Sequence, residues 1–191
     1  MENKIKVVFV DIDGVLNDYK TDEYTPDGYV GIDSDKVEML SILCKELDLK
    51  IVLSSSWRKE IVNKTIDGLY ALSKFSEYNL DVYDSTSFDG SISDAKRATQ
   101  IKAWLDTHPE VEDYIILDDE QFNISSEGYR DLMNRFVYTN QSHRYGMVYA
   151  RGIFESRTLY AAKPTELLTK ALEIIDRVSE EKGYITREEE S

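Results

Sequence analysis

The chain has few residues of several types, and each scarcity narrows what it can be. Its 191 residues include one cysteine, Cys44, which cannot form an internal disulfide, so a reducing cytoplasm is the expected location. No apolar run approaches the roughly 20 residues of a membrane-spanning helix. The N-terminal sequence MENKIKVVFVDIDG enters a strand and an acidic motif directly, so we expect no signal peptide. The two histidines, His108 and His143, have no carboxylate or serine partner that the sequence indicates, and neither receives a catalytic role.

Basic residues are also in the minority. Lys and Arg number 23 against 37 Asp and Glu, which gives a net charge of −14 and a pI near 4.6. Binding along an extended nucleic acid needs a basic surface, so we expect no extended nucleic-acid footprint. Residues 135–163 are the exception, with five basic residues against one acidic residue. This segment is either a solvated hairpin or a local site for an anionic substrate.

Apolar runs typical of buried strands alternate with amphipathic stretches typical of helices. The expected strands are 5–10, 50–53, 80–83, 114–117 and 136–139. Expected helices begin at Asp33 or Ser34, at Ser93 or Asp94, and at Pro164, and another carries Val62, Ile66, Leu69 and Leu72 at helical spacing. This alternation predicts an α/β fold, a three-layer Rossmann-like parallel sheet with helices on both faces. We expect one domain over residues 1–178, with a possible β-hairpin addition at about 142–160, and a charged, frayed tail over 179–191.

Polar residues follow three of the expected strands. Asp11 and Asp13 come after the first strand, Ser54–Ser56 after the second, and Asp118 and Asp119 after the fourth. In an open α/β sheet, ligands bind beyond the carboxyl ends of the strands. Carboxylates that end buried strands are costly unless a cation or hydrogen bonds compensate them. The four carboxylates therefore predict a site for a hard cation, and Mg²⁺ is the usual one where phosphate is also bound.

These segments resemble the motifs of a known enzyme superfamily. VVFVDIDGVLN (7–17), IVLSSSWR (51–58) and YIILDD (114–119) are similar to motifs I, II and IV of the haloacid dehalogenase-like (HAD) hydrolases. In particular, they resemble the small HAD domains of Swiss Army Knife RNA-repair proteins, whose motif III helix is similar to the sequence from Arg97 onward. Each motif is weak alone, but four in the right order and spacing are specific. The resemblance covers most of 5–119 and fades downstream.

The resemblance implies a phosphatase that acts through an aspartyl-phosphate. Asp11 would be the nucleophile, and Asp13 would protonate the leaving oxygen and later take a proton from water. Asp118 and Asp119 would bind Mg²⁺ together with Asp11 and with Asp13, the last through its main-chain carbonyl.

Other residues in the same motifs would bind the substrate phosphate. Ser54 would donate a hydrogen bond to a phosphoryl oxygen, with the Ser55 amide nearby. Most of the superfamily has a lysine in motif III, whereas this chain has Arg97 with Lys96 beside it, and either cation could stabilise the phosphoryl oxygens. Arg58 could contact the substrate or form a surface ion pair.

The sequence leaves several substrates open. No stretch before Ser54 or before Arg97 is long enough for a large cap domain, so 15–31 would form only a short flap over the site. An open site admits nucleic-acid 3′-phosphate ends, whereas the acidic balance favours nucleotides or other small phosphorylated metabolites.

Two other functions fit the sequence less well. A DxD metal-dependent glycosyltransferase would leave Ser54, Arg97 and the Asp118–Asp119 pair without a role. An inactive HAD domain that serves as a binding module would be expected to lack Asp11 or Asp13, and both are present.

Overall fold

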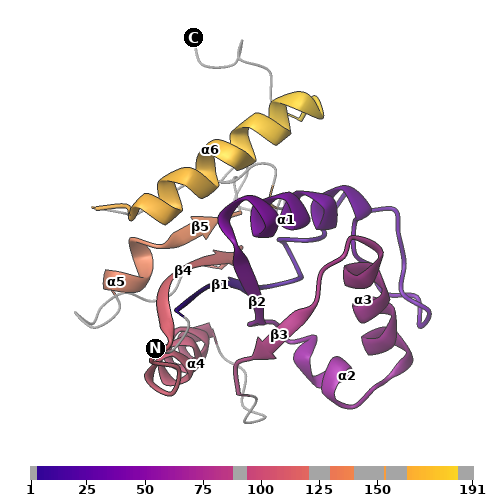
Figure 1. Cartoon of the computed structure of the whole chain (residues 1–191). Helices are drawn as coiled ribbons and strands as arrows, with labels where there is room; N and C mark the ends of the chain where they lie inside the picture. The colour runs from indigo at the N-terminus through magenta and orange to yellow at the C-terminus, as the bar shows by residue number, and fades with distance from the viewer. Residues whose placement is uncertain (1–3, 88–93, 121–129, 140–152, 154–162, 185–191) are drawn as a thin grey trace.

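A computed structural model describes residues 4–87, 94–120, 130–139, 153 and 163–184, apart from the side chains of 94–96. Its centre is a five-stranded parallel sheet in the order β3-β2-β1-β4-β5 (Figure 1). The strands are β1 (Ile5–Val10), β2 (Leu49–Leu53), β3 (Val82–Ser85), β4 (Val111–Asp118) and β5 (Phe136–Tyr138). The helices are α1 (Ser34–Leu47), α2 (Arg58–Val62), α3 (Ile66–Glu77), α4 (Asp94–Asp106), α5 (Arg130–Met133) and α6 (Glu166–Glu181). The predicted α/β fold is confirmed.

β1 lies at the centre of the sheet between β2 and β4, and both β1 and β4 have apolar side chains on both faces. Val7–Val10 and Ile115–Leu117 are fully buried. In the sheet, Val10 lies opposite Leu53 of β2 and Leu117 of β4. The three strands therefore end at the same edge, and the polar residues that follow or end them leave the sheet side by side: Asp11, Ser54 and Asp118.

Alternate side chains of the strands face two separate helical layers. On one face, Val8 and Val10 belong to an apolar cluster with α1, α3 and α6. On the other face, Val7 and Phe9 pack with α4 and α5. The rings of Phe9 and Trp104 are nearly perpendicular, with 5.3 Å between their centroids. Figure 1 shows α1 and α6 on one side of the sheet and α4 on the other. This arrangement gives the three layers that the sequence predicts.

The chain between β1 and α1 forms only a short flap. It contains one isolated antiparallel bridge, between Tyr24 and Val30. α1 then begins where the sequence predicts, because the Asp33 side chain caps it by accepting a hydrogen bond from the Asp35 amide. Every residue from Asp11 to Ser54 is described, and this stretch contains no cap domain, as expected.

The helix expected around Val62–Leu72 is instead two helices. α2 ends at Val62, and α3 starts after a left-handed residue, Lys64 (φ 52°), with Thr65 as its cap. The apolar residues that indicate a helix here do not form its buried face: Val62, Ile66 and Leu69 are 71%, 57% and 53% exposed. α3 packs through Ala71 and Phe75 instead.

The C-terminal helix runs past the expected domain boundary. Ser179 was expected to begin the frayed tail, but it lies inside α6, is fully buried, and donates a hydrogen bond to the Ile175 carbonyl at 2.6 Å. Beyond the helix, Lys182 forms ion pairs with Asp35 and Glu38. The rest of the expected tail, 185–191, and the expected hairpin at 142–160 other than Ile153, lie outside the described residues. Within the described chain, no helix has the length and apolar character to cross a membrane.

Candidate active site

Three carboxylates converge where β1 and β4 end. Asp11 follows β1, Asp118 ends β4, and Asp119 comes next in the chain. One carboxylate oxygen of each lies within 4.8 Å of the other two. Asp11 is 3% exposed and Asp118 is fully buried. The structure therefore brings together three of the four residues that the sequence assigns to a metal site, and the side chain of the fourth, Asp13, has other partners.

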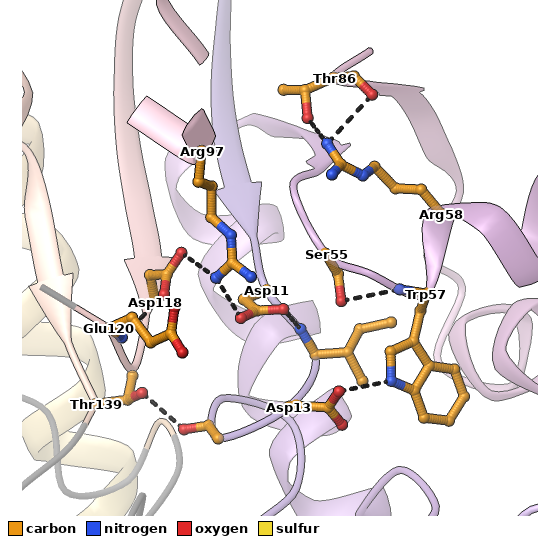
Figure 2. Close-up of polar contacts among 12 residues, drawn as sticks. Asp11, Asp13, Ser55, Trp57, Arg58, Thr86, Arg97, Asp118, Glu120 and Thr139 are labelled. Atoms are coloured by element: carbon orange, nitrogen blue, oxygen red, sulfur yellow. Dashed lines mark hydrogen bonds and ion pairs between the residues drawn. The ribbon is translucent and has the colours of Figure 1, made fainter. Parts of the chain in front are cut away.

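Arg97 supplies positive charge to this cluster. It reaches in from α4, and its Nη1 donates to Asp11 Oδ2 at 2.6 Å and to Asp118 Oδ2 at 2.7 Å (Figure 2). Burial disfavours the charged guanidinium, but the two carboxylates outweigh this effect and raise the pKa of Arg97. Of the two motif III candidates, Arg97 thus faces the carboxylates, while the side chain of Lys96 lies outside the described residues.

One arginine does not offset three carboxylates. Burial and the charge of Asp11 raise the pKa of Asp118 well above its usual value and raise the pKa of Asp119 to about 7. Burial also raises the pKa of Asp11, although Arg97 and the Ser55 side chain oppose the shift. The ionised cluster is therefore disfavoured unless a further cation enters it. An all-oxygen donor set of carboxylates fits a hard divalent cation such as Mg²⁺.

Asp13 lies beside the cluster, with both carboxylate oxygens hydrogen-bonded. Asn17 Nδ2 donates to Oδ1 at 3.0 Å, and Trp57 Nε1 donates to Oδ2 at 3.0 Å. Asn17 also accepts from the Gly14 amide at 2.9 Å and donates to the Gly31 carbonyl at 3.0 Å. This network ties the turn after β1, where Gly14 takes a left-handed φ of 74°, to the end of the flap. No pattern in the sequence predicts a role for Asn17 or the contact between Trp57 and Asp13.

Ser54 is buried and its hydroxyl is unsatisfied. The residue is 1% exposed, its amide donates to the Val10 carbonyl at 2.9 Å, and its Oγ has no hydrogen-bond partner among the described residues. A buried hydroxyl that lacks a partner costs about 1–3 kcal/mol, so such a group is expected to have a ligand to bond. Neighbouring Ser55 is fully buried, and its Oγ accepts from the Trp57 amide at 3.4 Å.

Arg58 points away from the carboxylates, as Figure 2 shows. It is 3% exposed, so of the two alternatives that the sequence leaves open for Arg58, a surface ion pair is contradicted by its burial. Its guanidinium donates to two oxygens of Thr86, the hydroxyl and, at 3.3 Å, the carbonyl. It also donates to the Ser87 carbonyl at 3.4 Å and to Gln100 Oε1 at 3.3 Å. These bonds connect the start of α2 to the residues after β3 and to α4. They favour a structural role for Arg58 over contact with a substrate.

Two further residues at strand ends join the site. Thr139, after β5, donates its hydroxyl to the Gly14 carbonyl at 2.7 Å, and the Glu120 amide donates to Asp118 Oδ1 at 3.0 Å. Both positions could have been found with the rule that located Asp11 and Ser54, because both are polar residues at the carboxyl end of a strand.

The chain matches a known protein family. The sequence model for the HAD domain in Swiss Army Knife RNA repair proteins aligns with residues 7–147. The matched range starts in β1, runs past β5, and includes all of the candidate site residues. Among curated proteins, none is similar enough to count as a relative. The chain therefore belongs to the HAD superfamily, as a HAD domain of the type found in Swiss Army Knife RNA repair proteins.

Proposed function

We propose that this protein is a divalent-metal-dependent phosphomonoester hydrolase with Asp11 as its nucleophile. Membership of a HAD family implies a phosphatase-type hydrolase. The observation that carries the proposal is the cluster of Asp11, Asp118 and Asp119 around one guanidinium, with its excess of negative charge. The unsatisfied hydroxyl of Ser54, which comes from the neighbouring strand, adds support because a phosphoryl oxygen would accept its hydrogen bond.

In the proposed chemistry, Asp11 is the nucleophile and Asp13 transfers the protons. Asp11 attacks phosphorus and forms an aspartyl-phosphate while the bond from phosphorus to the leaving oxygen breaks. Asp13 gives its proton to that leaving oxygen. It then takes a proton from the water that attacks the aspartyl-phosphate, which releases inorganic phosphate and regenerates Asp11. Arg97, already hydrogen-bonded to Asp11, offsets negative charge on the phosphoryl oxygens.

The metal ligands would be the carboxylates of Asp11, Asp118 and Asp119, together with the Asp13 carbonyl. Mg²⁺ bound there would neutralise charge on the phosphoryl group and help to orient it. The role of this chain is to hold the ligands at one sheet edge, where two of them are already buried and preorganised.

For the substrate we propose a nucleic-acid 3′-phosphate end. The name of the matching family, which refers to RNA repair, supports this class. A large substrate is also supported by the described residues from Asp11 to Ser54, which form only a short flap and no cap domain. A small phosphorylated metabolite or nucleotide is the second candidate, favoured by the net charge of −14.

The test begins with hydrolysis of a generic aryl phosphate in Mg²⁺ and in chelator. We expect turnover only with the metal, and a rise in melting temperature on adding Mg²⁺, because a ligand of the folded state stabilises it. A panel of 3′- and 5′-phosphorylated oligonucleotides and nucleotides then ranks substrates by kcat/KM, with the 3′-phosphorylated oligonucleotide expected to be best. No hydrolysis of any phosphomonoester in Mg²⁺ would contradict the proposal and favour an inactive binding module.

A further inference from the structure

The indole of Trp57, in the segment 51–58, donates a hydrogen bond to the carboxylate of Asp13, in the segment 7–17. Trp57 lies in the loop between β2 and α2, and its Nε1 donates to Asp13 Oδ2 at 3.0 Å (Figure 2). The ring is partly buried and packs against the core on the face covered by α1, α3 and α6. Because its ring is anchored by packing and its amide by Ser55 Oγ, Trp57 presents a fixed donor to Asp13.

Two donors from different segments fix the plane of this carboxylate. Asn17 holds Oδ1 from the flap side, at the same distance at which Trp57 holds Oδ2. Asp13 is itself exposed, and an exposed carboxylate with one donor can turn about its last side-chain bond, which has a broad rotational preference. With a donor on each oxygen, that rotation is restricted.

The same hydrogen bonds limit where Asp13 can carry a proton. Each carboxylate oxygen has two lone pairs, and in each oxygen one of them already faces an N–H group. A proton on the lone pair that faces either N–H would bring the carboxyl O–H and that N–H, both donors, into contact and cost the hydrogen bond. The proton must therefore occupy one of the remaining lone pairs, so the two partners restrict the direction in which Asp13 can donate it.

We propose that Trp57 is a positioning residue for acid–base catalysis, whose indole N–H orients Asp13 toward the leaving oxygen of the substrate. This inference rests on the proposed phosphatase function and adds a residue to it. General acid catalysis contributes roughly 10²–10⁴ to a rate, and a misplacement of about 1 Å can remove about 100-fold. The contribution matters most for an alkyl phosphate, whose leaving oxygen is basic, and least for an activated aryl phosphate.

The variant Trp57→Phe removes the N–H and keeps an aromatic ring. We expect kcat/KM to fall about tenfold or more on an alkyl phosphate and less than about threefold on an aryl phosphate. These losses raise the ratio of kcat/KM for the aryl phosphate to kcat/KM for the alkyl phosphate. Asp13→Ala should raise this aryl-to-alkyl ratio further. The chain offers a matched control, because its second tryptophan, Trp104, also donates its indole N–H to an aspartate, Asp84, at 2.7 Å. Trp104→Phe loses an equivalent bond outside the acid–base site and should leave the ratio unchanged.

The outcomes separate this inference from the function on which it rests. If the wild-type protein hydrolyses neither substrate in Mg²⁺, the proposed function itself fails. If the wild-type protein is active but Trp57→Phe lowers both rates equally, or leaves the ratio as it was, the positioning role is wrong and the function stands. Thermal melting of each variant shows whether a loss on both substrates comes from unfolding.

A second measurement does not need the Trp57 variant to fold. The chain has two tryptophans, so ¹⁵N-labelled protein gives two indole N–H signals in NMR spectra. Trp104→Phe identifies one of them by its disappearance. In Asp13→Ala we expect the signal of Trp57 to move, because its acceptor is gone, while that of Trp104 stays. An unchanged Trp57 signal would overturn the proposal.

Discussion

Arg97 and Arg58 come from two regions of the same sheet edge and show how differently a buried arginine can be used. Arg97, with 11% of its side chain exposed, lies at the β1–β4 end and donates to two carboxylates. Arg58, 3% exposed, lies at the β2–β3 end, where its described acceptors are neutral oxygens such as Gln100 Oε1 and the Thr86 carbonyl. Both arginines occur in segments that resemble catalytic motifs, so the motif alone does not distinguish them.

The difference lies in what charge remains after the hydrogen bonds are made. At the β1–β4 end, three carboxylates surround one guanidinium, and negative charge is left over to attract a cation. At the β2–β3 end, Arg58 begins α2, and its branched guanidinium joins this helix to the residues after β3 and to α4. We infer that the first region carries the chemistry and the second keeps the scaffold in place.

The largest effect is expected from Asp11→Asn. An amide cannot form the aspartyl-phosphate, so turnover should fall by about 10³-fold or more, or roughly 4 kcal/mol in the barrier. The fold should survive, because asparagine has nearly the same shape. Steady-state hydrolysis and circular dichroism provide the measurement. Activity within about tenfold of wild type would remove Asp11 as the nucleophile.

The matched pair Arg97→Met and Arg58→Met tests whether the two arginines differ in role. Arg97→Met should lower kcat by roughly 10²–10³, since it removes electrostatic stabilisation of the phosphoryl group. Arg58→Met should lower the melting temperature by several degrees, since about 1–3 kcal/mol is lost when buried acceptors lose their donor, and should reduce kcat by less than about tenfold. Kinetics and thermal melting on both variants decide the matter. A larger kcat loss for Arg58→Met than for Arg97→Met would reverse the roles of the two arginines.

A smaller effect is expected when calcium replaces magnesium. Calcium takes six to eight oxygen ligands at longer distances, so it could engage both oxygens of Asp11 and leave none oriented for attack. We expect a rate at least about tenfold lower in Ca²⁺ and inhibition of the Mg²⁺-supported reaction. Melting curves with each ion serve as the control for binding, because both should stabilise the fold. Comparable rates in the two ions, or full activity in chelator, would exclude this metal site.

Much of the β1–β4 region could be predicted because it depends on short-range patterns. An apolar run that ends in Asp11, and another that ends in Asp118 and Asp119, define both the strand and the polar residues at its end. Parallel pairing then brings these ends together without further information from the sequence. Asp33 is likewise a local signal, because a capping side chain acts on the amide two residues ahead.

The unpredicted features depend on partners that are distant in sequence. The bond between Trp57 and Asp13, and the choice of Thr86 and Gln100 as acceptors for Arg58, depend on how separate elements pack. The face that α3 buries was also missed, since its fit depends on Gly68, whose missing side chain allows close contact with the Glu60 backbone. The extension of α6 to Glu181 leaves Ser179 buried and is followed by ion pairs of Lys182 with Asp35 and Glu38, contacts that helical spacing alone does not show.

A third region, the basic segment 135–163, differs in charge from the rest of the chain. It has a balance of +4 in a chain of net charge −14, and most of it lies outside the described residues. Ile153, which is described, is fully buried and donates its amide to the Val15 carbonyl at 3.0 Å. Val15 is two residues beyond Asp13 and begins the flap. The contact therefore connects this segment to the site and motivates the smallest of the expected effects.

Neutralising the segment should weaken binding of a polyanion without changing the chemistry. The variant replaces three arginines by glutamine: Arg144, Arg151 and Arg157. For a short 3′-phosphorylated oligonucleotide we expect KM to rise several-fold with kcat nearly unchanged, the pattern for an interaction made equally in the ground and transition states. Added salt should weaken binding by the wild type more than by the variant, because fewer counterions are released when fewer cations engage the phosphates.

A control variant removes the same charge elsewhere and should leave KM and its salt dependence as in the wild type. It replaces three basic residues of α1 and α6: Lys45, Lys170 and Arg177. An equal rise in KM for both triple variants would assign the effect to net charge alone, and unchanged KM for the arginine variant would identify the segment as a solvated surface.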